Sequence, residues 1–145
     1  MTDDASLAGR HYSAPATYVV AREVVRQFAD ALGVDHPLHR DEVAAREAGY
    51  ADVVAPTTFA VVVAQPATDA MMADPTVGLE YSRIVHGEQV FVHHAPIVAG
   101  DELTAEMTVA GVRAAAGASM LTLVTEVATV AGEPRSTVTA LLVHR

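Results

Sequence analysis

The stretch that decides the fold is PTTFAVVVAQPATDAMMA, residues 56–73, which contains one acidic side chain and no basic one. The three valines at 61–63 are poor helix formers and, taken alone, fit a strand. The length of the apolar run and the proline at its start favour a buried helix, with Pro56 at the first helical position. Pro66 lies inside the run, so we expect a kink or a break there.

The second half of the chain is rich in Val, Thr and Leu, and turn residues divide it into four segments. We predict strands over 83–94, 101–112, 119–130 and 136–144. In the second segment apolar residues from Leu103 to Val109 alternate with threonine and glutamate, which is typical of a half-buried antiparallel strand. The other sheet face needs a cover, and residues 56–73 are long and apolar enough to provide it. The predicted fold class is α+β, a curved antiparallel sheet wrapped around one long helix.

The first half predicts a short strand over 17–20, a helix from about Val24 that ends at Gly33, and a second helix over 41–48. Between the helices lies GVDHPLH, residues 33–39. Pro37 restricts this turn, so we expect the side chain of His39 to be held in place.

Histidine exchanges protons near neutral pH, and a nearby carboxylate, Asp35 or Asp41, can orient its ring. The turn therefore predicts an acid/base unit, and the alternative is an ordinary turn in which aspartate caps the backbone. A metal site built from His36, His39 and Asp41 is a weaker hypothesis, because three ligands would come from one short turn. We predict neither a metal nor a cofactor.

Composition limits the other possibilities. The chain has 145 residues, 51% of them hydrophobic, which fits a single domain over residues 1–145. It lacks a long apolar run and a signal peptide, so we expect a cytoplasmic protein that does not enter a membrane. The absence of cysteine excludes disulfides, thiolate zinc sites and cysteine nucleophiles. A net charge of −9 argues against nucleic acid as a partner, although a local basic pocket can still bind a small anion.

Several short motifs, in their order and spacing, resemble one protein family. They are GRHY at 9–12, GY at 49–50, VAPTTF at 54–59, HGEQ at 86–89 and PIVAGD at 96–101. Together they resemble the MaoC-like (R)-specific enoyl-thioester hydratases, in particular the short single-hot-dog proteins related to the N-terminal half of MaoC-type dehydratases. The resemblance implies a hot-dog fold, one long helix wrapped by an antiparallel sheet, which agrees with the pattern of apolar residues.

The hydratase motif of that family runs Gly-Asp-x-Asn-Pro-aliphatic-His. The matching positions here are Gly33, Pro37, Leu38 and His39. Val34 stands at the aspartate position and His36 at the asparagine position, whereas Asp35 comes one residue later. The resemblance therefore implies His39 as a catalytic residue, and Asp35 as its partner if the turn is rebuilt locally.

The reaction implied by the resemblance is the addition of water to a trans-2-enoyl thioester, or its loss from a 3-hydroxyacyl thioester. Charge develops on the thioester oxygen, and the N–H of Thr57 at the start of the long helix is the candidate donor to it. His86 and Gly87 are candidate substrate-binding residues that line the acyl tunnel if His86 points inward; otherwise His86 has a structural or interface role. Arg83 and Arg113 either meet the phosphates of CoA or are solvated.

Two functions remain open at this point. The first is a hydratase or dehydratase of thioesters carried by CoA or acyl carrier protein. The second is a non-catalytic hot-dog subunit that binds the acyl group or shapes the acyl channel of a partner dehydratase chain. In both cases we expect a homodimer or a heterodimer with a catalytic hot-dog chain, because a single hot dog exposes a sheet edge.

Overall fold

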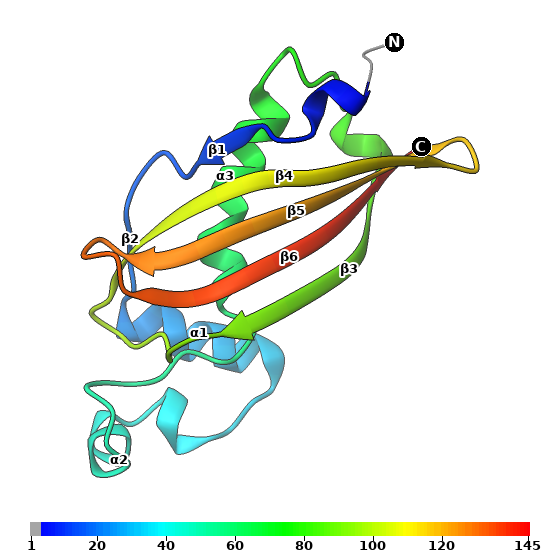
Figure 1. Cartoon of the computed structure of the whole chain (residues 1–145). Helices are drawn as coiled ribbons and strands as arrows, with labels where there is room; N and C mark the ends of the chain where they lie inside the picture. Colours follow the sequence, from blue (N-terminus) through cyan, green and yellow to red (C-terminus); the bar gives the residue numbers. More distant parts are fainter. Residues whose placement is uncertain (1–3) are drawn as a thin grey trace.

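The computed structural model describes residues 4–145 and consists of one antiparallel sheet wrapped around a helix (Figure 1). The strands are β1 (His11–Ser13), β2 (Tyr18–Val19), β3 (Ile84–His93), β4 (Glu102–Ala115), β5 (Ala118–Thr129) and β6 (Pro134–His144). The α-helices are α1 (Arg22–Leu32), α2 (Glu42–Glu47) and α3 (Ala60–Ala73). Short 3₁₀ turns are η1 (Asp4–Leu7), η2 (Pro37–His39) and η3 (Tyr81–Arg83). The predicted α+β class is confirmed.

The sheet order is β1-β4-β5-β6-β3, and β2 also pairs with β4. All four strands predicted in the second half are present. Alternating side chains bury one face of β4, β5 and β6, whereas no residue of the edge strand β3 is fully buried. The β4–β5 hairpin turns at Ala116 and Gly117, both with positive φ. β1 was not predicted, since three residues are too few to show an alternating pattern.

The central helix, α3, packs against the concave face of the sheet (Figure 1). The predicted start at Pro56 is wrong, because the Pro56 carbonyl accepts a hydrogen bond from the Phe59 N–H at 2.9 Å and closes a turn first. α3 also continues through Pro66 without a break. Burial of Ala64 and Ala67 against the sheet outweighs the one backbone hydrogen bond that proline removes.

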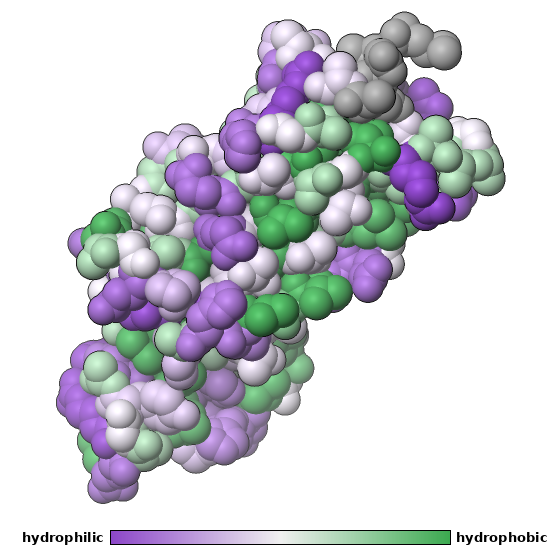
Figure 2. Space-filling view, viewed as in Figure 1, coloured by the Kyte–Doolittle hydropathy of each residue, from purple (hydrophilic) through white to green (hydrophobic). Residues whose placement is uncertain are grey.

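The edge formed by β3 carries exposed valines. Val85, Val90 and Val92 are 53%, 41% and 53% exposed, and Figure 2 shows hydrophobic side chains along this edge. The opposite edge is made of the much shorter β1 and β2. Within residues 4–145, no helix is both long and apolar enough to cross a bilayer.

Candidate functional site

The turn with the two histidines is built by the ends of its neighbouring helices. α1 ends at Gly33, whose φ of 68° is the left-handed conformation that glycine adopts without strain. The Nδ1 atom of His36 accepts a hydrogen bond from the Leu38 N–H at 3.2 Å. Asp41 caps α2 by accepting from the Val43 N–H at 2.8 Å. The carboxylate of Asp41 therefore serves the backbone and does not contact a histidine.

His39 is half-buried and held by one hydrogen bond. Its Nδ1 atom lies 2.5 Å from the carbonyl oxygen of Val54. A carbonyl oxygen only accepts, so Nδ1 carries the hydrogen and Nε2 of the neutral ring keeps its lone pair. The ring of His36 lies beside it, with 5.9 Å between the ring centroids. His39 is thus oriented so that Nε2 can accept a proton.

Asp35 points to solvent. Its side chain is 96% exposed, and its Oδ1 atom lies 3.4 Å from the buried Nε of Arg40 in an ion pair without hydrogen-bond geometry. Arg40 is fixed by two further contacts, 2.6 Å to Asp30 and 2.8 Å to the Val34 carbonyl oxygen. Among residues 6–145, whose side chains the structure describes, no carboxylate forms a hydrogen bond or ion pair with His39. The structure therefore does not bring Asp35 and His39 together.

A cleft of about 330 Å³ lies beside this turn. Its lining is mostly apolar and consists of Val54, Ala55, Pro56, Thr57, Ala60, His93, His94, Ala95, Pro96 and Ile97. The same Val54 that binds the His39 ring also lines the cleft. Thr57 lines the cleft, and its N–H has no backbone hydrogen-bond partner within residues 4–145.

His93 ends β3 and His94 follows it; both are exposed, and sequence reasoning missed their place in the cleft. Two backbone hydrogen bonds bring this segment to the cleft, from Ala55 N–H to the Ile97 oxygen at 2.8 Å and from Ala99 N–H to the Val53 oxygen at 3.0 Å. These contacts join segments about 40 residues apart, so no local sequence pattern predicts them. The only signal in the sequence is the pair of histidines before Pro96.

A second hollow, of about 160 Å³, lies between α3 and the inner face of β3, β5 and β6. His86 and Gln89 from β3 line it, opposite the α3 residues Ala64 and Met72. The Nε2 atom of His86 lies 3.0 Å from the Glu88 carbonyl oxygen across a bulge in β3. Gly87 occupies that bulge and is not part of the lining. The hollow is largely apolar, which suits a hydrocarbon tail.

Ion pairs hold the segment that carries Val54. Arg22 donates to Asp52 at 2.9 and 2.7 Å and also pairs with Glu42 at 2.5 Å, which links α1, α2 and residue 52. The hydrogen bonds from Arg22 hold the pKa of Asp52 below its ordinary value, against the opposing effect of burial. The carboxylate also accepts from the Val53 N–H at 2.8 Å. This network fixes the backbone that orients His39.

A second pair supports the other wall of the cleft. Arg135 on β6 binds Asp101 through two nitrogens, at 3.0 and 3.2 Å, and both side chains are more than four-fifths buried. The pKa of Arg135 is raised by its hydrogen bond to Asp101. Asp101 also accepts from the Val98 N–H at 3.2 Å. The bidentate pair therefore anchors residues 96–101 to the sheet.

Similarity to known proteins shows the family of this chain. Residues 6–138 match the family described as FAS1-like, dehydratase domain region. The chain belongs to this family. A UPF0336 protein of Saccharopolyspora erythraea is 49% identical over 142 residues, covering 98% of this chain and 91% of that protein. A UPF0336 protein of Clavibacter michiganensis is 50% identical over 135 residues, with coverages of 93% and 89%.

Solved structures of other members confirm the hot-dog fold and the MaoC-like resemblance. A chain of the HadBC (3R-hydroxyacyl-ACP dehydratase) complex of Mycobacterium tuberculosis superposes with a TM-score of 0.84 and 31% identity, covering 94% of this chain and 96% of that one. A MaoC-like dehydratase gives a TM-score of 0.86 and 35% identity, and this chain covers 43% of its length. The family is thus one of hot-dog dehydratase domains.

Proposed function

We propose that this chain is the channel-forming subunit of a two-chain 3-hydroxyacyl-thioester dehydratase. The carrying observation is the isolation of His39, whose ring contacts no carboxylate within residues 4–145 while Asp35 is 96% exposed and paired with Arg40. Dehydration removes a proton from C2 and the hydroxyl from C3 as water, so it needs a base and an acid. His39 alone supplies only one of these two groups. In the proposed complex, the partner chain supplies both the base and the acid.

The acyl group has a suitable place in this chain. The thioester lies in the cleft, where the Thr57 N–H donates to the oxygen that becomes negatively charged. The tail extends into the hollow under α3, lined by His86 beside the Gly87 bulge. Apolar walls of this kind select the tail by its length and exclude water from it.

The partner binds at the β3 edge. β3 is ten residues long and carries three exposed valines, whereas strands at natural sheet edges are usually short, charged or covered. A second hot-dog chain that adds its own β3 antiparallel to this one continues the sheet and buries those valines. The HadBC neighbour, a complex of two named subunits, supports an assembly of this kind.

Hydration of crotonyl thioesters tests the proposal, followed by loss of the conjugated double bond. We expect no turnover from the purified chain alone. We expect turnover from its complex with a hot-dog chain that carries the full Gly-Asp-x-Asn-Pro-aliphatic-His motif, encoded in the same genome. In that complex His39→Ala changes the rate by less than roughly threefold, whereas substitution of the partner's aspartate abolishes it. Turnover by the chain alone contradicts the proposal.

One observation favours a second candidate, a self-contained dehydratase. The hydrogen bond from His39 Nδ1 to the Val54 carbonyl leaves Nε2 free to act as a base, and the turn can bring in Asp35 once its pairing with Arg40 is broken. This candidate predicts turnover without a partner, lowered by roughly 10²- to 10⁴-fold in both His39→Ala and Asp35→Asn. An unchanged rate in Asp35→Asn would remove Asp35 from the site.

A further inference from the structure

The nine arginines, which are the only strongly basic residues of this lysine-free chain, divide into two sets. Six form ion pairs with carboxylates, namely Arg10, Arg22, Arg26, Arg40, Arg46 and Arg135. Arg83, Arg113 and Arg145 form no ion pair with any carboxylate in the part of the chain that the structure describes. All three are exposed.

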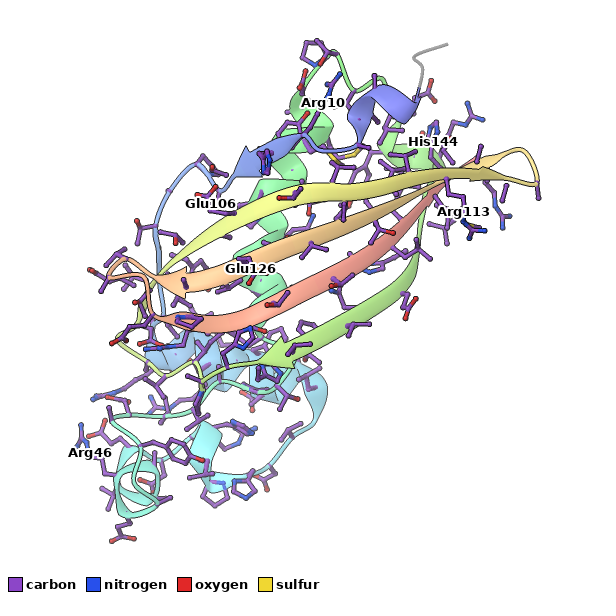
Figure 3. The ribbon with its side chains drawn as sticks, in the orientation of Figure 1. Arg10, Arg46, Glu106, Arg113, Glu126 and His144 are labelled. Carbon is purple, nitrogen blue, oxygen red and sulfur yellow. The ribbon has the colours of Figure 1, made fainter. Side chains whose placement is uncertain are left out.

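These three arginines come together at one end of the sheet. Arg83 precedes β3 and Arg145 follows β6, and the Arg145 N–H donates to the Arg83 carbonyl oxygen at 3.2 Å. Arg113 lies on β4 opposite Met120 of β5, with its Nη2 atom 3.0 Å from the sulfur. Figure 3 shows Arg113 and His144 at this end, opposite the end where Arg46 lies. We call Arg83, Arg113 and Arg145 the arginine cluster.

The three arginines of the cluster lie on or next to different strands at this end of the sheet. The cluster extends over four adjacent strands, about 15 Å at the usual strand spacing. None of its members lines the cleft or the hollow under α3. The exposed acids nearest along the chain, Glu80 and Glu88, do not pair with it. A single phosphate is bound by guanidinium groups that converge, whereas this arrangement fits a broad acidic surface.

The proposed pairing of chains places the cluster beside a second active site. Two β3 strands that pair antiparallel put the start of one next to the end of the other. Here the start of β3 adjoins Arg83, and its end carries His93 and leads to His94, both of which line the cleft. The arginine cluster of this chain therefore lies next to the corresponding cleft of its partner, far from its own.

We propose that the arginine cluster is the docking surface for an acidic acyl carrier protein that delivers its thioester to the partner's cleft. This inference rests on the proposed function. Elsewhere the chain, with a net charge of −9, repels an acidic protein, so the unpaired arginines define the one attractive approach within the described residues. The substrate is then a thioester on a carrier protein, and a CoA thioester makes no use of the cluster.

Parallel kinetics on two carriers test the proposal with the two-chain complex. The substrates are crotonyl groups on the acyl carrier protein of the same genome and on CoA. In the variant Arg83→Gln, Arg113→Gln, Arg145→Gln, we expect the KM for the carrier-protein substrate to rise roughly tenfold or more, with kcat and the KM for crotonyl-CoA unchanged. The wild-type KM for the carrier protein rises with salt, and the variant loses this dependence. Arg46→Gln, an exposed arginine at the opposite end, is the matched control and leaves both KM values unchanged.

Two outcomes overturn the inference. An equal rise in both KM values means that the cluster binds phosphate groups of either carrier, and no change in either means that the carrier docks elsewhere. Binding of a fluorescently labelled, unloaded carrier protein to the complex, read by anisotropy, separates this inference from the proposed function. Binding that the triple variant loses supports the docking surface even if the complex shows no turnover. Binding that the triple variant keeps contradicts the docking surface even if turnover is observed.

Discussion

The two ends of the sheet use the same residue type in different ways. At the end that carries the cleft, Arg22, Arg40 and Arg135 are bound to carboxylates at 2.5 to 3.0 Å and fix the segments around the site. At the other end, Arg83 and Arg113 form no ion pair with any carboxylate of residues 6–145, whose side chains the structure describes. An arginine whose charge is neutralised within the chain adds to its structure, whereas an unpaired one remains available to a partner. The following predictions test this division.

The largest effect is expected from Arg135→Met. This change leaves the carboxylate of Asp101 nearly buried without its partner, and we expect a loss of about 3 to 5 kcal/mol in the free energy of unfolding. Urea unfolding followed by circular dichroism measures it. Arg113→Met at the other end is the matched control, with an expected change below about 0.5 kcal/mol. Similar losses of unfolding free energy in the two variants would contradict the proposed difference between the arginines at the two ends of the sheet.

Asp52→Asn comes next. The asparagine keeps the shape but loses the charge that accepts hydrogen bonds from Arg22, so we expect a loss of about 2 kcal/mol. Glu80→Gln, an exposed acid near the arginine cluster, is the control for removing one negative charge and should leave stability nearly unchanged. A larger loss of unfolding free energy in Glu80→Gln than in Asp52→Asn would show that ion pairs hold the end of the sheet with the arginine cluster.

The pH dependence of stability should report on the same carboxylate. The pKa of Asp52 in the folded chain lies below its ordinary value of 3.8, chiefly because of the hydrogen bonds from Arg22. Its contribution is therefore fully present at pH values well above 3.8 and is lost as the pH falls through 3.8 towards the folded pKa. Unfolding free energies measured from pH 7 down to pH 3 should fall more steeply in the wild type than in Asp52→Asn. Parallel curves would rule out Asp52 as a source of acid sensitivity.

Sequence reasoning predicted what depends on local pattern and missed what depends on contacts between distant segments. Segments rich in Val, Thr and Leu between turn residues located β3 to β6, and the length of the apolar run located α3. The start of α3 was misplaced because a turn at Pro56, closed by Phe59, precedes the helix. The side chain of Asp35 is 96% exposed and lies 3.4 Å from Arg40 instead of next to His39, and the motif alone does not predict this.

The sites formed by several segments were predicted least well. The cleft joins residues 54–60 to residues 93–97 through backbone hydrogen bonds between the two segments. The arginine cluster joins positions 83, 113 and 145, which only the antiparallel register brings together. In the sequence these arginines look scattered. Their spacing does not distinguish an arginine that pairs with a carboxylate from one that does not. The distinction needs the positions of all the carboxylates.

The smallest effect on stability is expected from replacing all three arginines of the cluster by glutamine. No short-range ion pair is lost among the described residues, so the remaining cost is long-range repulsion as the formal charge goes from −9 to −12. At physiological ionic strength charges more than about 8 Å apart are largely screened, and we expect a loss below about 0.5 kcal/mol that disappears in 1 M salt. Urea unfolding at both salt concentrations measures it. A loss above about 1 kcal/mol that persists in 1 M salt would mean that these arginines hold the fold together, and their role as a free surface would then fail.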